Sequence, residues 1–298
     1  MKNKVVLVLG AIAMIAGFQN CAKTQFKDSP KSDAAPSIDT PAPTGDVVGH
    51  GDDGGECSIT KITIPTKMLF VVDMSGSNAY TSKVTFSDNT VVNFPPTDPT
   101  KSFRAGVMQK FLDLYKDKSN FSWGLIGFAA PPDQPNGEII AFINNNGDEK
   151  NPRFSKDPQD FQSGLNNFKT RADKSFAQTP YKAAQEMAIK AIQNDPDLNA
   201  ADAPQYLVIF LTDGLPTDQY DSSTPSALVS LASPGRIKMS IAYYTSVQNG
   251  HVNNFLSAVA KTGGGVFQAV DSTNWSSSFK IDDVIPRTDP NCPIASTN

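Results

Sequence analysis

Histidine is nearly absent from this chain of 298 residues, which contains only His50 and His251. A zinc hydrolase with a His-Glu-x-x-His motif needs a pair of histidines, and a Ser-His-Asp triad needs one beside its serine. His50 lies in a polar spacer, and His251 follows a glycine at the apparent start of a helix. The sequence therefore gives little support to either class of hydrolase.

Basic clusters are also lacking. The chain has 26 Lys and Arg against 30 Asp and Glu, which gives a formal net charge of −4. Without a run of basic residues it has no face suited to phosphate backbones, so we expect no nucleic-acid partner. Hydrophobic residues make up 39% of the chain and charged residues 19%, a balance typical of globular proteins long enough to bury a core.

The first twenty residues are typical of an export signal. Two lysines precede an apolar segment from Val5 to about Phe18, which is short for a membrane span. Cys21 follows, as in a bacterial lipoprotein signal, although Gln19-Asn20 departs from the usual small residue before the cysteine. We expect residues 1–20 to be removed and Cys21 to anchor the protein by lipid in the cell envelope. Ala22 after it favours the outer membrane. The alternative is an ordinary secretory signal with an incidental cysteine.

A second segment, residues 21–56, is rich in Pro, Ser, Asp, Thr and Gly and has hardly any large apolar residue. Such a composition cannot bury enough surface to fold, so it predicts a flexible tether. The remaining cysteines, Cys57 and Cys292, bracket nearly all of the patterned sequence. In an oxidising compartment they are expected to form a disulfide that closes the domain over residues 57–298, the alternative being two free buried thiols.

Beyond the tether, strand-like and helix-like stretches alternate. Met68–Val72 and Tyr206–Leu211 are continuous apolar runs, as expected for parallel strands buried on both faces. This alternation predicts an α/β fold with an open, mostly parallel sheet and helices on both faces. We also expect strands at Phe121–Ala129, Glu138–Ile143, Ile237–Tyr244 and Val266–Val270, and helices around Phe103–Leu114, Phe161–Phe168, Ala184–Ile192 and Val252–Lys261.

Two insertions enlarge this pattern, at about residues 79–98 and 130–156. The first contains Lys83–Phe94, whose alternating apolar and polar residues predict a β-hairpin next to the end of the first strand. Thr100 or Ser102 is a plausible N-cap for the helix that follows. Either insertion could alter or cover a ligand-binding face.

Oxygen-bearing side chains follow the two most apolar strands. Asp73, Ser75 and Ser77 come directly after the first, and Asp213 with Gly214 after the second. In open α/β sheets, ligands bind at the carboxyl ends of the strands.

A third oxygen-bearing residue precedes a predicted helix. Thr179 stands at its expected cap, with Pro180 in the first turn, which is also an ordinary helix-start signature. The three segments together offer two carboxylates and three hydroxyls but no thiol or imidazole. These hard oxygen donors suit Mg²⁺ better than zinc or copper.

Along the chain the three motifs come in the order Asp73-x-Ser75-x-Ser77, then Thr179, then Asp213-Gly214, and we call them the first, second and third. In this order they resemble the von Willebrand factor A domain with its metal-ion-dependent adhesion site, over roughly residues 66–285. The resemblance implies a Rossmann-like single domain that binds Mg²⁺ or Mn²⁺. Ser75 and Ser77 would bind the ion directly, Thr179 directly or through water, and Asp73 and Asp213 mostly through water. An open coordination position would then attract an Asp or Glu carboxylate from a partner protein.

On this interpretation, we expect the protein to be an envelope-anchored adhesion module rather than an enzyme. Its specificity would come from the rim of the site, which we expect to include Asn78, Tyr80, Tyr181, Leu215, Pro216 and Thr217. One alternative is a structural envelope scaffold whose metal site only orders loops. An enzyme is more distant, because a haloacid-dehalogenase phosphatase needs a second Asp where the chain has Ser75, and no Gly-x-Ser-x-Gly elbow is present.

Overall fold

The computed structural model describes residues 64–285, apart from 86–90, 131–137, 175–177 and 247–248. The predicted signal peptide and tether, together with Cys21, Cys57 and Cys292, lie outside the described residues. All elements below belong to one compact unit, residues 59–85 and 91–298. None of its described helices is long and apolar enough to cross a membrane.

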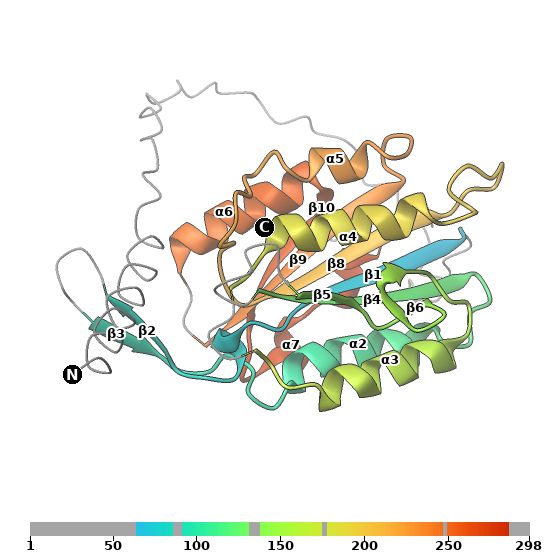
Figure 1. The fold of residues 1–298 in the computed structure, drawn as a ribbon. Helices are drawn as coiled ribbons and strands as arrows, with labels where there is room; N and C mark the ends of the chain where they lie inside the picture. The colour runs from blue at the N-terminus through green and yellow to red at the C-terminus, as the bar shows by residue number, and fades with distance from the viewer. Residues whose placement is uncertain (1–63, 86–90, 131–137, 175–177, 247–248, 286–298) are drawn as a thin grey trace, which may run out of the picture. The chain divides into compact units, whose positions relative to one another are not determined.

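A six-stranded sheet forms the centre of this unit, in the order β10-β9-β8-β1-β4-β5 (Figure 1). The first five of these strands are parallel to their neighbours, and β5 runs antiparallel to β4. The fold class predicted from the sequence is confirmed. The strands are β1 (Thr66–Asp73), β4 (Phe121–Ala129), β5 (Glu138–Ala141), β8 (Gln205–Thr212), β9 (Ile237–Thr245) and β10 (Gly264–Asp271).

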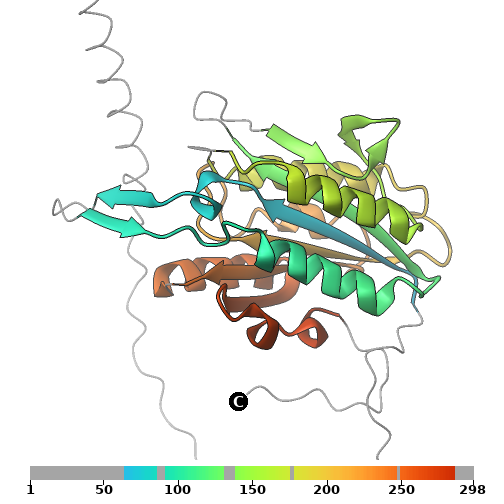
Figure 2. The ribbon, with the colours of Figure 1, turned by 90° about the horizontal axis from the view of Figure 1, so that it is seen from below.

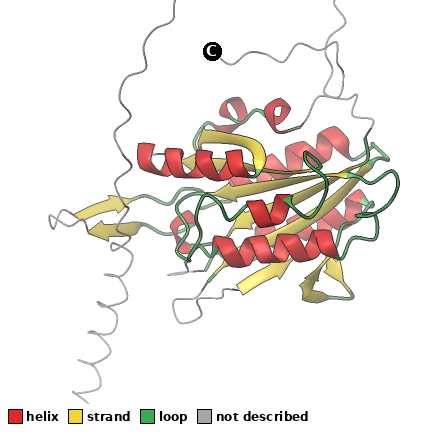
Figure 3. Ribbon diagram, turned by 90° about the horizontal axis from the view of Figure 1, so that it is seen from above, coloured by secondary structure: helices red, strands yellow, loops and turns green. Residues whose placement is uncertain are grey.

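Helices cover both faces of the sheet, which explains why its central strands β1, β4 and β8 are buried at every position (Figures 1 and 3). In β1, Met68, Phe70 and Val72 face one core, whereas Leu69 and Val71 face the other. The first core is covered by α2 (Ser102–Tyr115), α3 (Pro158–Thr170), α7 (Trp275–Ser278) and α8 (Ile281–Val284). The second is covered by α4 (Tyr181–Gln193), α5 (Ser226–Val229) and α6 (Gly250–Thr262).

The start of α2 differs from the prediction. Neither Thr100 nor Ser102 is its N-cap, because Lys101 occupies that position in the left-handed conformation, with φ 57°. The first amides of α2 are instead bonded from outside the helix: the Asp98 carboxylate accepts the N–H of Phe103 at 3.0 Å. A residue upstream of the cap thus satisfies donors that the helix leaves free.

The start of α4 differs in the same way. Pro180 is its N-cap and Tyr181 its first residue, so Thr179 stands outside the helix rather than at its cap. The Asp218 carboxylate, from the loop after β8, accepts the Lys182 N–H at 2.7 Å. The loop after β8 thereby helps to cap α4, the helix that follows Thr179.

The predicted hairpin is present as β2 (Ser82–Thr85) and β3 (Val91–Phe94), paired antiparallel with Ser82 opposite Phe94. Its turn lies outside the described residues. Figure 2 shows the two strands leaving the sheet on the side of the short 3-10 turn η2 (Gly76–Asn78), which follows β1.

The described part of the second insertion leads away from the predicted site. Because β5 is antiparallel to β4, with Ala129 opposite Glu138 and Ile126 opposite Ala141, the chain leaves the carboxyl edge as it advances. It continues into β6 (Asn144–Asn145) and β7 (Asp148–Pro152), and Ser155 then bridges back to Trp123 near the start of β4. Residues 138–156 therefore do not cover the ligand face.

Candidate metal centre

The end of β1 places Asp73 at the carboxyl edge of the sheet, where its side chain is fully buried. Its Oδ1 accepts the Ser75 N–H at 2.8 Å, a turn that aspartate forms readily with the amide two residues on. Its Oδ2 accepts the Thr212 hydroxyl of β8 at 3.0 Å. The carboxylate is thus held by both its own loop and the neighbouring strand.

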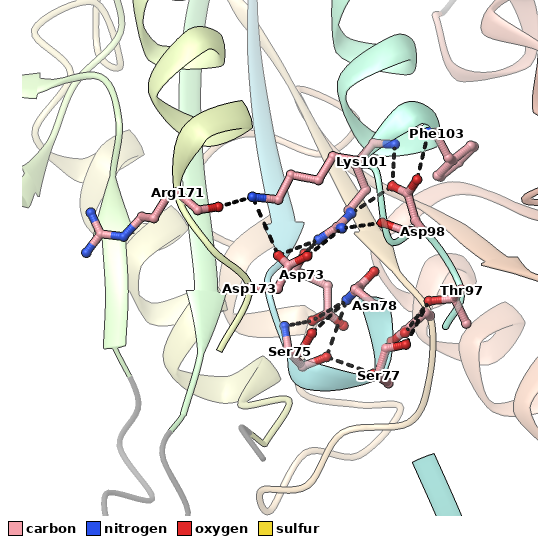
Figure 4. A network of polar contacts seen from close by, with 12 residues as sticks. Asp73, Ser75, Ser77, Asn78, Thr97, Asp98, Lys101, Phe103, Arg171 and Asp173 are labelled. Atoms are coloured by element: carbon pink, nitrogen blue, oxygen red, sulfur yellow. Dashed lines mark hydrogen bonds and ion pairs between the residues drawn. The ribbon is translucent and has the colours of Figure 1, made fainter. Parts of the chain in front are cut away.

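A chain of hydroxyls links the first motif to the third (Figure 4). Ser77 Oγ donates to Asp213 Oδ1 at 3.0 Å. Ser75 Oγ lies 3.0 Å from Ser77 Oγ, and since a serine hydroxyl has one proton, Ser75 is the donor in this pair. Four of the five predicted ligands therefore gather at one point, from loops more than 130 residues apart in the sequence, as the separation of 136 between Ser77 and Asp213 shows.

The fifth predicted ligand, Thr179, is bonded through its backbone to Thr217 in the loop after β8. Its N–H donates to the Thr217 hydroxyl at 2.8 Å, and its carbonyl accepts the Thr217 N–H at 3.0 Å. Within the described residues, no hydrogen bond links its side chain to Asp73, Ser77 or Asp213. The structure thus holds Thr179 against the loop that follows Asp213, and within the described residues no hydrogen bond brings its hydroxyl into the cluster.

The two carboxylates are both held in surroundings that disfavour their charge. Burial, and then repulsion from Asp213, raises the pKa of Asp73 from 3.8 to about 7. The pKa of the partly exposed Asp213 is also raised, chiefly because the surrounding protein desolvates it, against the hydrogen bonds from Thr97 and Ser77. A nearby cation would reverse this effect for both groups.

The donor set fits a hard divalent cation. In the described part of the chain, no Lys, Arg or His forms an ion pair with Asp73 or Asp213. The same residues contain no group of three or more His, Cys, Asp or Glu that could hold a metal, so a site here depends on hydroxyl oxygens. Two carboxylates and neutral hydroxyls match the ligand chemistry of Mg²⁺ and Mn²⁺.

The predicted rim is only partly at the surface. Asn78 and Tyr181 are buried, 0% and 1% exposed, so their assignment to the rim was wrong. The Tyr181 hydroxyl lies 2.6 Å from both the Thr212 hydroxyl and the Gly214 carbonyl, and Asn78 accepts from Tyr244 at 2.6 Å. Tyr80 is 50% exposed, and Leu215, Pro216 and Thr217 are partly or fully exposed.

Thr97 is a residue of the site that the sequence did not reveal. Its hydroxyl donates to Asp213 Oδ2 at 2.6 Å. No motif marks it, since it follows the hairpin in a Pro-Pro-Thr-Asp segment typical of a turn. Its partner is 116 residues away, and no local pattern reports a contact at that distance.

Comparison with known proteins gives similarity only at the level of structure. No protein-family model matches the sequence, and no curated protein resembles it significantly. Proximal thread matrix protein 1 from the mussel byssus shares 13% identity at a TM-score of 0.48, covering 72% of this chain and 46% of its own. A second structure of that protein has a zinc-occupied motif of the adhesion-site type.

Two bacterial proteins give comparable values. The von Willebrand factor type A protein from Catenulispora acidiphila shares 11% identity at a TM-score of 0.46, over 72% of this chain and 41% of its own. The pilus adhesin SpaC from Lactobacillus rhamnosus GG shares 14% at a TM-score of 0.42, over 71% and 29%. The chain thus matches less than half the length of each of these proteins. Its own strand order, with the first and third motifs meeting at the carboxyl edge of β1 and β8, is a fold that fits the von Willebrand factor A domain.

Proposed function

We propose that Asp73, Ser75, Ser77, Thr179 and Asp213 hold one Mg²⁺ or Mn²⁺ ion. The observation that supports this most directly is the contact of Ser75, Ser77 and Asp213 beside the buried Asp73, with no basic side chain paired to either carboxylate in the described residues. Neutral hydroxyls would leave the ion under-neutralised. A bound ion of this kind supplies an electrophilic position for a carboxylate oxygen.

The surrounding residues keep the oxygens in place. The Ser75 amide and the Thr212 hydroxyl fix the two oxygens of Asp73, and Tyr181 supports Thr212 from within the core. The Thr217 hydroxyl and the Asp218 carboxylate hold the segment around Thr179 by accepting the backbone N–H groups of Thr179 and Lys182. Such outer contacts orient ligands before an ion arrives.

On this basis the protein is a binding module that captures an Asp or Glu carboxylate of a partner protein, not an enzyme. We propose that residues 57–298 form the binding domain and that residues 21–56 tether it to the envelope, with lipid on Cys21 holding it to the outer membrane. A Cys57–Cys292 disulfide would close the ends of the domain.

Calorimetry on the full-length protein tests the metal site. Mg²⁺ and Mn²⁺ should bind with a one-to-one stoichiometry, and Asp73→Ala should largely abolish binding. Asp271→Ala is a matched control, because Asp271 also ends a parallel strand and accepts the N–H two residues on, from Thr273, but is exposed. Unchanged affinity in Asp73→Ala would refute the site.

A pull-down from envelope and target-cell extracts tests the capture of a partner. A protein retained in Mg²⁺, released by EDTA and lost with Asp73→Ala would support carboxylate capture.

The scaffold alternative draws support from one observation: Asp73 and Ser75 are 0% and 1% exposed, as expected for groups that order a loop. It predicts that Mg²⁺ raises the melting temperature while no partner is retained in an EDTA-sensitive way.

Two further measurements test the anchor and the disulfide. Palmitate labelling should be lost in Cys21→Ser, with release of the protein to the soluble fraction.

A non-reduced digest should contain the linked Cys57 and Cys292 peptides, whereas free-thiol labelling at both would exclude the bridge.

A further inference from the structure

The segment that returns from the hairpin, Pro95–Asp98, is bonded directly into the candidate metal centre, and we name it the hairpin root. The Thr97 hydroxyl donates to Asp213 Oδ2 at 2.6 Å, and its N–H donates to the Ser77 carbonyl at 3.2 Å (Figure 4). The Asp98 N–H donates to the Asn78 carbonyl at 3.1 Å. The root therefore contacts both the first and the third motif.

A buried arginine fixes the root in this position. Arg104 is 0% exposed, and its Nε and Nη2 donate to the carboxylate and the carbonyl of Asp98, both at 2.9 Å. Both oxygens of Asp173 accept from it at 2.9–3.0 Å, and its Nη1 also donates to the Asp73 carbonyl at 2.6 Å. These bonds use all the N–H donors of a guanidinium group. One side chain thus ties the hairpin root to the end of β1.

Thr97 differs in role from the other donor to Asp213. Within the described residues, the Asp213 side chain accepts hydrogen bonds from Ser77 and Thr97. Ser77 belongs to the proposed ligand set, and its hydroxyl oxygen must be available to an ion. Thr97 lies outside that set, so its hydroxyl has only to hold the Asp213 carboxylate and, at 3.4 Å, the Ser77 carbonyl.

We propose that Thr97 is a positioning residue of the metal centre, which makes the root of the first insertion a working part of the site. This inference rests on the proposed metal site. Residues that orient a metal-bound carboxylate typically account for about 10–100-fold in metal affinity. Since Thr97 is one of two side-chain donors to Asp213, we expect the lower end of this range.

The test is Mn²⁺ and Mg²⁺ binding by the full-length protein and its Thr97 variants. Thr97→Val keeps the shape of the side chain but removes the hydroxyl, and it should weaken the binding of both ions about ten-fold. Thr97→Ser restores the hydroxyl and should stay within about two-fold of the wild type. Thr170→Val is the matched control, because its hydroxyl bonds only to carbonyls of its own helix, those of Asn166 and Asn167. Electron paramagnetic resonance of free and bound Mn²⁺ gives the affinity independently of any partner.

Cooperative thermal unfolding in EDTA shows that a variant is folded. If Thr97→Val does not fold, Thr97→Ala is used in its place. Equal or tighter Mn²⁺ binding by the folded variant overturns the role of Thr97 while leaving the metal site intact. Failure of the wild type to bind either ion overturns both proposals. Weaker binding that Thr97→Ser does not restore also contradicts the inference, because the loss would then not follow the hydroxyl.

Discussion

Two pairs of aspartates lie close to the end of β1, and the protein treats them in opposite ways. Asp98 and Asp173 are 2% and 6% exposed, and both pair with Arg104 at 2.9 Å. Asp73 and Asp213 accept hydrogen bonds only from neutral groups of the described residues, namely hydroxyls, an amide N–H and, at 3.4 Å, the Asn78 side chain. Lys101 Nζ also lies 3.8 Å from Asp173, so the first pair of carboxylates has two positive partners, whereas the second pair forms no ion pair within the described residues.

The difference indicates where a cation belongs. A buried carboxylate without a positive partner is unfavourable, and a protein normally avoids it by pairing or by protonation. The Arg104 guanidinium supports the second pair only through the carbonyl of Asp73, leaving its carboxylate to the hydroxyl cluster. We interpret Arg104 as a permanent positive charge that neutralises the first pair, and the proposed ion as a positive charge that neutralises the second pair only when it is bound.

Removing this permanent charge should have the largest effect. Arg104→Met leaves Asp98 buried without a counter-charge and Asp173 with only Lys101 Nζ at 3.8 Å, so we expect the free energy of unfolding to fall by about 3–5 kcal/mol in urea titrations. Arg171→Met is the control, since Arg171 is 30% exposed and pairs with Glu138 and Glu149 near the surface; it should cost about 1 kcal/mol or less. Similar values for both variants would contradict the comparison.

Because Asp73 and Asp213 have no positive partner among the described residues, the metal-free protein should become less stable as the pH rises. The pKa of Asp73 is about 7 in the folded state against 3.8 ordinarily, so the folded protein binds more protons than the unfolded chain between these values. Its contribution to stability is complete below about pH 4 and is lost as pH rises through 7, a change of up to about 4 kcal/mol. Urea titrations in EDTA from pH 4 to 8 measure it.

Saturating Mg²⁺ should oppose this loss, because it binds the ionised carboxylates and stabilises the folded state more strongly at higher pH. A pH profile that is identical with Mg²⁺ and with EDTA would contradict the interpretation of the second pair.

Neutral substitution should separate the two pairs by the sign of its effect. At pH 8 in EDTA, Asp73→Asn removes an unpaired buried charge and should raise the free energy of unfolding by about 1–3 kcal/mol while abolishing Mg²⁺ binding. Asp98→Asn removes a partner of Arg104 and of the first amides of α2, so it should lower stability. Two changes of the same sign would show that the pairs are not different in kind.

The sequence was sufficient for the frame of this arrangement. Continuous apolar runs predicted β1 and β8 because the central residues of a strand covered on both faces are apolar, and the positions of Asp73 and Asp213 follow from where β1 and β8 end. These signals are local or periodic, so they can be recognised without knowing which parts of the chain are neighbours in space.

The charge balance could not be predicted in this way. In the sequence, Arg104 is simply one polar residue within a predicted helix, and its partner Asp173 lies 69 residues away. Asn78 and Tyr181 were placed on the rim because they adjoin motif residues, yet both point into the core. Adjacency along the chain does not say which face a side chain takes where a strand gives way to a turn.

The hairpin offers the smallest expected change and the finest test of which part of the insertion serves the metal. Ser82 and Phe94 are opposite each other, so their backbones lie about 5 Å apart and a short Gly-Ser turn can replace residues 82–94. The hairpin root then stays, with Thr97 on Asp213 and Asp98 on Arg104. We therefore expect Mg²⁺ affinity to change by less than about two-fold, against the ten-fold loss for Thr97→Val. If β2 and β3 serve the partner, EDTA-sensitive retention of that partner should weaken in the same variant, and a large loss of Mg²⁺ affinity would show instead that the root is not held by Arg104 alone.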